Sequence, residues 1–143
     1  MATSPQERIE LTRAAWEAYN AGDLDAVLDY FDRDIVVQVP IELGNAGTYR
    51  GHQAFLRWLG AWNEAWESFD IRVVETIAVG DRHAVSNVSQ TGIGTGSGVQ
   101  VTRDMGWVFE VRDRRCVSIG LQTNFDAAVA AAREREGLAG AGG

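Results

Sequence analysis

The chain has 143 residues, of which 45% are hydrophobic and 23% charged, a composition typical of one globular domain. Its net charge of −7 argues against binding to nucleic acid or to an anionic membrane surface. No apolar stretch is long enough to cross a membrane, and the first residues lack the apolar segment of a secretory signal. With a single cysteine, Cys116, no intrachain disulfide can form, and we expect a cytoplasmic location.

The residue types that are missing exclude several chemistries. All 13 basic residues are arginines, so reactions that need a lysine Schiff base are excluded. One cysteine and two isolated histidines, His52 and His83, cannot form a thiolate or imidazole zinc cluster. A magnesium site formed by carboxylates is not excluded, although no regularly spaced group of acidic residues predicts one. We therefore expect neither a metal nor an organic cofactor.

Two helices separated by a sharp corner are predicted at the start of the chain. The first spans residues 5 to about 20, with Ser4 as its N-cap and proline at its first position. The glycine-containing segment 20–22 ends it, and Asp23 caps the second helix directly afterwards. The sequence therefore predicts a helix, a sharp break and a second helix in this segment.

The rest of the chain predicts an α+β domain. The further elements are a strand over 34–43, a loop, a helix from about residue 52, four strands over 69–79, 84–92, 100–111 and 116–124, and a helix over 126–136. Helices first and antiparallel strands last indicate helices packed on one face of a sheet. We predict a single domain over residues 1–136 and a disordered glycine- and alanine-rich tail over 137–143.

Aromatic residues repeat every three or four positions in the third helix and near the end of the first. Trp58, Trp62 and Trp66 form one stripe, and Trp16 and Tyr19 another. Such stripes occur in the cores of proteins and in the walls of pockets for flat apolar ligands. The periodicity alone leaves both readings open.

Three segments, in this order along the chain, resemble the SnoaL-like branch of the nuclear-transport-factor-2-like superfamily: YNAGDLDAVLDYFDRDIVV, TYRGHQAFLRWL and WVFEVRDRRCVSIG. The resemblance covers about residues 7–131. It implies a cone, in which a curved antiparallel sheet wraps around three helices and leaves a pocket for a small apolar molecule. It also implies a homodimer formed through one face of the sheet. The corner after the first helix would then bring Trp16 and Tyr19 to the pocket.

The superfamily includes enzymes whose chemistry can be tested at the corresponding positions. The catalytic carboxylate, oxyanion aspartate and helix tyrosine of ketosteroid isomerases fall at Val39, Gly106 and Ala15, which cannot do this chemistry. The Arg-x-Asp pair of limonene-type epoxide hydrolases is also missing, because Arg103 and Asp104 are adjacent and point to opposite faces of a strand.

A cyclase that uses one acidic residue remains compatible with the sequence. The other aspartate of the epoxide hydrolases corresponds to about Thr123, which leaves Asp104 as the candidate acid or base. Asp104 shares a strand face with Gly106, which the resemblance places inside the cone. The alternative is that Asp104 lies at the end of the strand and pairs with Arg50 or Arg103.

Neutral polar residues alternate along the predicted strand 84–92. Asn87, Ser89 and Thr91 share one face, and they could bind a hydroxyl or carbonyl group inside the cone or form an exposed or dimerising face. The resulting candidate substrate-binding residues are Trp16, Tyr19, Val39, Trp58, Trp62, Asn87, Gly106 and Thr123. We predict a small-molecule-binding protein that is either a cofactor-independent cyclase, isomerase or hydrolase acting on a polyketide- or steroid-like compound, or a ligand-binding or dimerisation module without catalysis.

Overall fold

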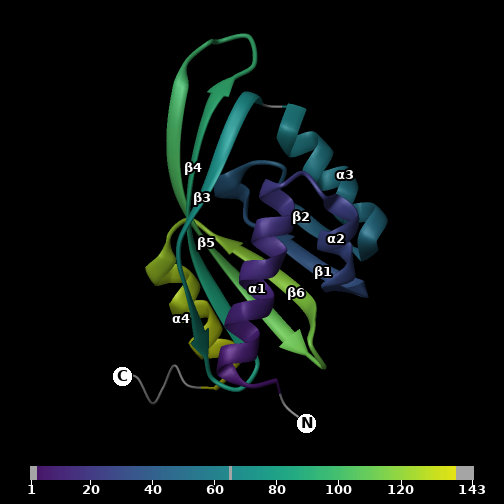
Figure 1. The fold of residues 1–143 in the computed structure, drawn as a ribbon. Helices are drawn as coiled ribbons and strands as arrows, with labels where there is room; N and C mark the ends of the chain where they lie inside the picture. Colours follow the sequence, from purple (N-terminus) through teal and green to yellow (C-terminus); the bar gives the residue numbers. More distant parts are fainter. Residues whose placement is uncertain (1–2, 65, 138–143) are drawn as a thin grey trace.

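The computed structural model describes residues 3–64 and 66–137 (Figure 1). The elements are α1 (Pro5–Asn20), α2 (Leu24–Asp29), β1 (Phe31–Val39), a 3-10 turn η1 (Ile41–Leu43), β2 (Gly47–Arg50), α3 (Gly51–Glu64), β3 (Trp66–Val79), β4 (His83–Gly94), β5 (Gln100–Arg112), β6 (Arg115–Gln122) and α4 (Phe125–Arg135). The predicted tail falls on 137–143, of which 138–143 lie outside the described residues. No described helix has both the length and the hydropathy that crossing a bilayer requires.

The strands form one curved sheet with the order β2-β1-β6-β5-β4-β3 in the described part of the chain. Neighbouring strands are antiparallel, except that β1 runs parallel to β6. In Figure 1, α1, α2 and α3 lie on the concave side of the sheet, and the β4–β5 hairpin extends beyond them. The predicted α+β cone is confirmed.

Local sequence chemistry fixes the first corner. The Ser4 side chain accepts a hydrogen bond from the Glu7 backbone, and the Glu7 carboxylate accepts one from the Ser4 backbone, which completes a capping box. Gly22 then takes a positive φ of 77°, and the Asp23 carboxylate accepts a hydrogen bond from the Ala26 N–H at the start of α2. Both predicted caps are confirmed.

Four elements differ from the sequence prediction. The strand predicted over 34–43 is β1, which begins at Phe31 and ends at Val39, and residues 41–43 form the turn η1. The segment 47–50, predicted as loop, forms the edge strand β2. Trp66 begins β3 rather than ending α3, because the helix stops at Glu64. The terminal helix α4 packs on the face of the sheet opposite the other helices, where Ala128 and Ala132 contact Val85 and Val108. The sheet is therefore covered on both faces along part of its length.

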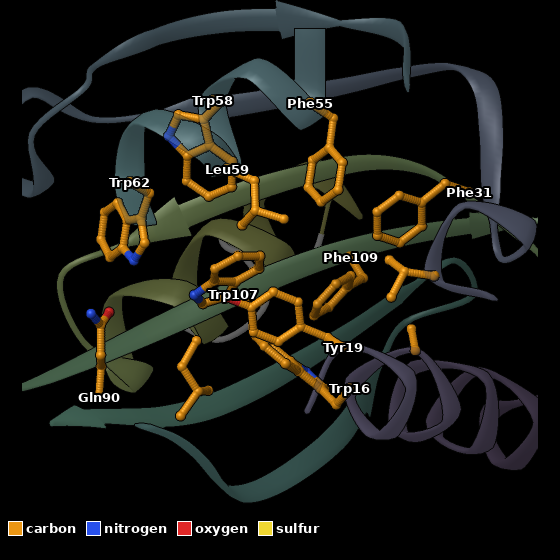
Figure 2. Close-up of a pocket in the computed structure, with 13 residues that line it drawn as sticks. Trp16, Tyr19, Phe31, Phe55, Trp58, Leu59, Trp62, Gln90, Trp107 and Phe109 are labelled. Atoms are coloured by element: carbon orange, nitrogen blue, oxygen red, sulfur yellow. The ribbon is translucent and has the colours of Figure 1, made fainter. Parts of the chain in front are cut away.

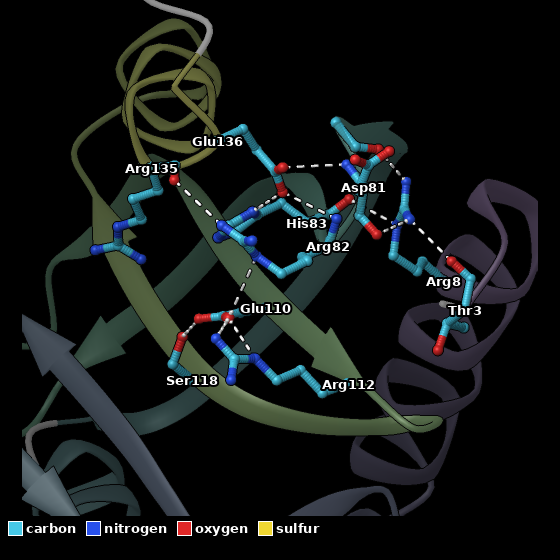
Figure 3. A network of polar contacts seen from close by, with 11 residues as sticks. Thr3, Arg8, Asp81, Arg82, His83, Glu110, Arg112, Ser118, Arg135 and Glu136 are labelled. Carbon is cyan, nitrogen blue, oxygen red and sulfur yellow. Dashed lines mark hydrogen bonds and ion pairs between the residues drawn. The ribbon is translucent and has the colours of Figure 1, made fainter. Parts of the chain in front are cut away.

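The turn between β3 and β4 ties both ends of the domain together (Figure 3). From one side, the buried Arg8 guanidinium of α1 donates to the carbonyl oxygens of Gly80, at 2.6 Å, and His83, at 3.1 Å. From the other side, the Glu136 carboxylate after α4 accepts hydrogen bonds from the backbone N–H groups of Asp81 and Arg82, at 3.1 and 2.9 Å, and contacts His83 Nδ1. This turn therefore holds α1 and α4 at the same end of the sheet.

The ionised form of Glu136 stabilises this attachment. Burial raises the pKa of its carboxyl, but the hydrogen bonds from His83 and from the Asp81 and Arg82 backbone outweigh burial, so the pKa lies below its usual 4.5. A depressed pKa in the folded state adds stability that is complete above the unfolded-state pKa and disappears as the pH falls through the folded-state pKa.

We predict that Glu136→Gln lowers the free energy of unfolding, and that the difference from the parent protein is largest above pH 4.5 and shrinks below it. Urea denaturation between pH 3 and 7, monitored by circular dichroism, measures this dependence. Glu134→Gln, on the exposed face of α4, is the matched control and should show no such dependence. If the difference in the free energy of unfolding between Glu136→Gln and the parent stayed constant below pH 4.5, the stabilising role of the ionised Glu136 carboxylate would be contradicted.

Candidate functional site

An apolar pocket lies between the helices and the concave face of the sheet (Figure 2). Eight of its 13 lining residues are aromatic, and no lining residue carries a formal charge at neutral pH. The lining residues are Ala15, Trp16, Tyr19, Val27, Phe31, Phe55, Trp58, Leu59, Trp62, Ile71, Gln90, Trp107 and Phe109. Thus α1, α2, α3 and four strands each contribute to its wall.

The aromatic side chains nearly fill this pocket. Trp107 lies at the centre, with its ring 4.9 Å from that of Trp16, 6.0 Å from that of Trp58 and 6.1 Å from that of Phe109. The cavity that remains has a volume of about 30 Å³, which is room for about two water molecules. A larger guest therefore requires some of these side chains to move.

One side of the pocket wall is fixed by a hydrogen-bonded chain. Trp16 Nε1 donates to Ser86 Oγ at 3.2 Å, and Ser86 Oγ lies 2.9 Å from Thr76 Oγ1. Tyr19, one turn further along α1, is only partly buried, and burial raises the pKa of its phenol to about 12. Tyr19 therefore stays neutral at physiological pH, and it is the one titratable side chain among the lining residues.

Other polar atoms of the pocket have no partner. Within the described residues, Trp58 Nε1, Trp107 Nε1 and both amide atoms of Gln90 are buried without a hydrogen bond. Unpartnered buried polar atoms are rare in folded proteins, because each costs about 1–3 kcal/mol. An interior that served only as a packed core would not be expected to keep four such atoms around one cavity.

The sequence profile of the SnoaL-like domain matches residues 12–119. The chain belongs to the SnoaL-like domain family. This match includes the corner after α1, the aromatic helix α3 and β5, from which most of the pocket is built. Among curated protein sequences, none matches the chain.

Solved structures share the fold of this SnoaL-like domain. The chain is 19% identical to TerC, which was co-crystallised with polyporic acid, over 85% of this chain and 94% of TerC, with a TM-score of 0.73. It is 16% identical to a protein of ketosteroid isomerase-like fold from Catenulispora acidiphila in complex with trimethylamine, over 85% and 90% of the two chains, with a TM-score of 0.67. It is 22% identical to a candidate polyketide cyclase from Xanthomonas campestris, over 90% and 98%, with a TM-score of 0.67.

Four of the candidate residues of this SnoaL-like domain line the pocket: Trp16, Tyr19, Trp58 and Trp62. Val39 is buried in the main core, 5% exposed, but it does not line the pocket. Thr123 lies exposed between β6 and α4.

Asp104, Gly106 and Asn87 lie on the other face of the sheet, and the expectation that Gly106 faces into the cone is wrong. Gly106 lies against Ala128 of α4 and against the carbonyl group of Asn124, the N-cap of that helix. Its neighbours Asn87, directly across on β4, and Asp104, two residues away, therefore also face outward. Asp104 is exposed, with no hydrogen-bond partner in the described structure other than strand pairing.

The inward rows of β4 and β5 hold the residues that sequence reasoning missed. On β5 these are Trp107 and Phe109, and on β4 they include Ser86 and Gln90. The signal was present in the alternation of β5, where large apolar residues at odd positions face the helices, whereas the even positions include Asp104 and Gly106.

Two further observations bound the chemistry of the site. Arg103, directly across from Gln90 on the inward row, does not line the pocket, and its guanidinium donates to the Leu43 carbonyl at 3.3 Å. No group of three or more histidine, cysteine or acidic residues is placed to hold a metal ion in the described part of the chain.

The outward position of Gly106 can be tested by adding one methyl group. We predict that Gly106→Ala lowers the free energy of unfolding by about 1–3 kcal/mol, because its Cβ would overlap Ala128 and the Asn124 carbonyl. The matched control is Gly60→Ala on the exposed face of α3, where a Cβ meets no atom within 4 Å. Because alanine favours a helix over glycine, this substitution should raise the free energy of unfolding by about 0.5–1 kcal/mol. Chemical denaturation measures both. A neutral or stabilising Gly106→Ala would show that α4 does not pack here.

Proposed function

We propose that this protein binds a small, predominantly apolar molecule inside the aromatic pocket of its cone. The observation that carries the proposal is the set of four buried polar atoms without partners around one apolar cavity. Such atoms cost stability unless something occupies the cavity and satisfies them. Lining by aromatic side chains, with few polar groups, is typical of small-molecule sites.

The small size of the cavity is compatible with binding because of how its wall is built. Tyr19 and Ile71 separate the cavity from grooves on the surface, where they also lie beside Asn20 and Asp70. Tyr19 is only partly buried and forms no side-chain hydrogen bond in the described structure, so no hydrogen bond has to break when its ring rotates. Rotation of this ring would open the cavity toward the surface and enlarge it.

We further propose that binding, rather than proton-transfer catalysis, is the activity of the cone. An acid–base reaction needs a group that exchanges a proton near neutral pH beside the substrate. The pocket offers only Tyr19, whose pKa of about 12 makes it a hydrogen-bond donor. Asp104, the acid or base expected for a cyclase acting on a polyketide- or steroid-like compound, is exposed on the opposite face. That TerC was co-crystallised with polyporic acid and the Catenulispora protein with trimethylamine supports a binding role for this fold.

Tryptophan fluorescence tests ligand binding, because four of the five tryptophans line the pocket. We predict saturable quenching or enhancement during titration with at least one member of a panel of steroids, hydroxyquinones and fused-ring ketones. Asp104→Asn should leave the dissociation constant and any turnover unchanged. A flat response to the whole panel would favour a cone filled by its own side chains, and a loss of turnover in Asp104→Asn would restore the catalytic hypothesis.

We also propose that the protein is a cytoplasmic homodimer that pairs through the outer face of the sheet beside α4. This area presents a row of short polar side chains, in which Thr91 and Thr102 are hydrogen-bonded across β4 and β5 at 3.2 Å. Asn87 and Ser89 continue the row on β4. Such groups suit a hydrated interface.

Sedimentation equilibrium tests this interface. We predict that Thr91→Arg converts a dimer to a monomer, because two copies would bring like charges together across the symmetry axis. Gln53→Arg, on the exposed face of α3, adds the same charge elsewhere and should leave the dimer intact. A monomeric parent protein, or a Thr91→Arg variant that remains a dimer, would contradict the proposal.

A further inference from the structure

Gln90 is the most informative residue of the pocket because it is polar, buried and without a partner. Its side chain is 2% exposed, and neither the amide nitrogen nor the amide oxygen forms a hydrogen bond. The residue directly across from Gln90 on β5 is Arg103, which does not line the pocket and donates a hydrogen bond to the Leu43 carbonyl. Gln90 therefore presents an uncharged amide to the cavity.

Two indole groups add donors to the same cavity. Trp58 from α3 and Trp107 from β5 have ring centres 6.0 Å apart, and both Nε1 atoms are buried without an acceptor. An indole N–H can only donate, whereas the glutamine amide offers two N–H donors and one carbonyl acceptor. The unpartnered groups thus supply four N–H donors against one acceptor, and the donors match a ligand oxygen with free lone pairs.

The polar and apolar parts of the pocket are separated. Figure 2 shows the Gln90 amide and the Trp58 and Trp107 indole nitrogens on one side, and the Phe31 and Phe55 rings on the other. No lining side chain offers a charge to an ionic ligand. Burying an ion in such surroundings is far more costly than burying a neutral dipole that is hydrogen-bonded.

We propose, on the basis of the binding function above, that the ligand is a neutral, flat molecule with a carbonyl-type oxygen at one end. The oxygen accepts hydrogen bonds from Gln90, Trp58 and Trp107, and the apolar body lies among Phe31, Phe55 and Phe109. In the absence of the ligand, the cavity of about 30 Å³ has room for water at the same donors.

Two probes with the same carbon skeleton test this assignment: 1-tetralone, which carries a ketone, and tetralin, which does not. Binding is followed by the indole N–H signals in nitrogen-15 NMR spectra of the parent protein. We expect 1-tetralone to bind about ten-fold more tightly than tetralin, because tetralin would displace water and leave the donors unpartnered. The Trp58 and Trp107 signals, assigned through Trp→Phe variants, should move downfield with 1-tetralone and not with tetralin.

Gln90→Leu removes the amide at nearly constant size. In this variant we expect the preference for 1-tetralone to fall to about three-fold or less, since one of its donors is gone. The control Gln53→Leu makes the same chemical change on the exposed face of α3 and should keep the parent preference. The indole shifts are measured in the parent protein itself, and the Trp→Phe variants serve only to assign the two signals.

The outcomes separate the two proposals. If both probes bind with equal affinity and the indole signals of Trp58 and Trp107 respond equally, the pocket binds apolar ligands but the carbonyl assignment is overturned. If 1-naphthoate or tetramethylammonium binds more tightly than 1-tetralone, the neutral class is overturned. If neither tetralin nor 1-tetralone binds, and the fluorescence panel is also silent, the binding function itself fails.

Discussion

The packing of α4 on the outer face of the sheet determines which side chains enter the cone. Ala128 lies where a Cβ of residue 106 would be, and the Arg135 guanidinium lies 3.0 Å from the Cβ position of residue 120, so glycine suits both sites. Because Gly106 faces α4, its neighbours Met105 and Trp107 have to face the helices. Strand pairing carries this choice to β4, where Gln90 and Ser86 turn inward. The composition of the pocket therefore depends on a contact on the opposite side of the sheet.

Much of the fold could be predicted from the sequence because the relevant signals are local. The Ser4 and Asp23 caps and the glycine at residue 22 use hydrogen bonds and dihedral angles that involve only a few neighbouring residues. The edge strand 47–50 was missed because its pairing with β1, and not its own four residues, makes it a strand. The position of α4 on the outer face was missed for the same reason, since its short apolar side chains are informative only beside Gly106.

The candidate site was predicted only in part, and the division follows the type of element. On helices, the periodicity of Trp16, Tyr19, Trp58 and Trp62 points one way, and all four line the pocket. On strands, an error of one residue exchanges the two faces. Placing Gly106 inside the cone by resemblance therefore also brought Asp104 inside and left Trp107 out. The alternation of polar residues on β4 suggested Asn87 in place of Gln90. The apolar alternation of β5 would have given the correct face without reference to any relative.

The inward face determined by α4 also restricts the chemistry of the cone. The pocket on this face is lined by aromatic rings, aliphatic side chains, two unpartnered indole N–H groups, one neutral amide and a phenol whose pKa burial raises to about 12. These groups can orient a dipole but cannot accept a proton near neutral pH. In the binding function that we propose, such an interior distinguishes ligands by the position of an acceptor oxygen, because a ligand that lacks the oxygen leaves the donors buried and unsatisfied. The same groups are therefore the basis of the selective binding that we propose in place of acid–base catalysis.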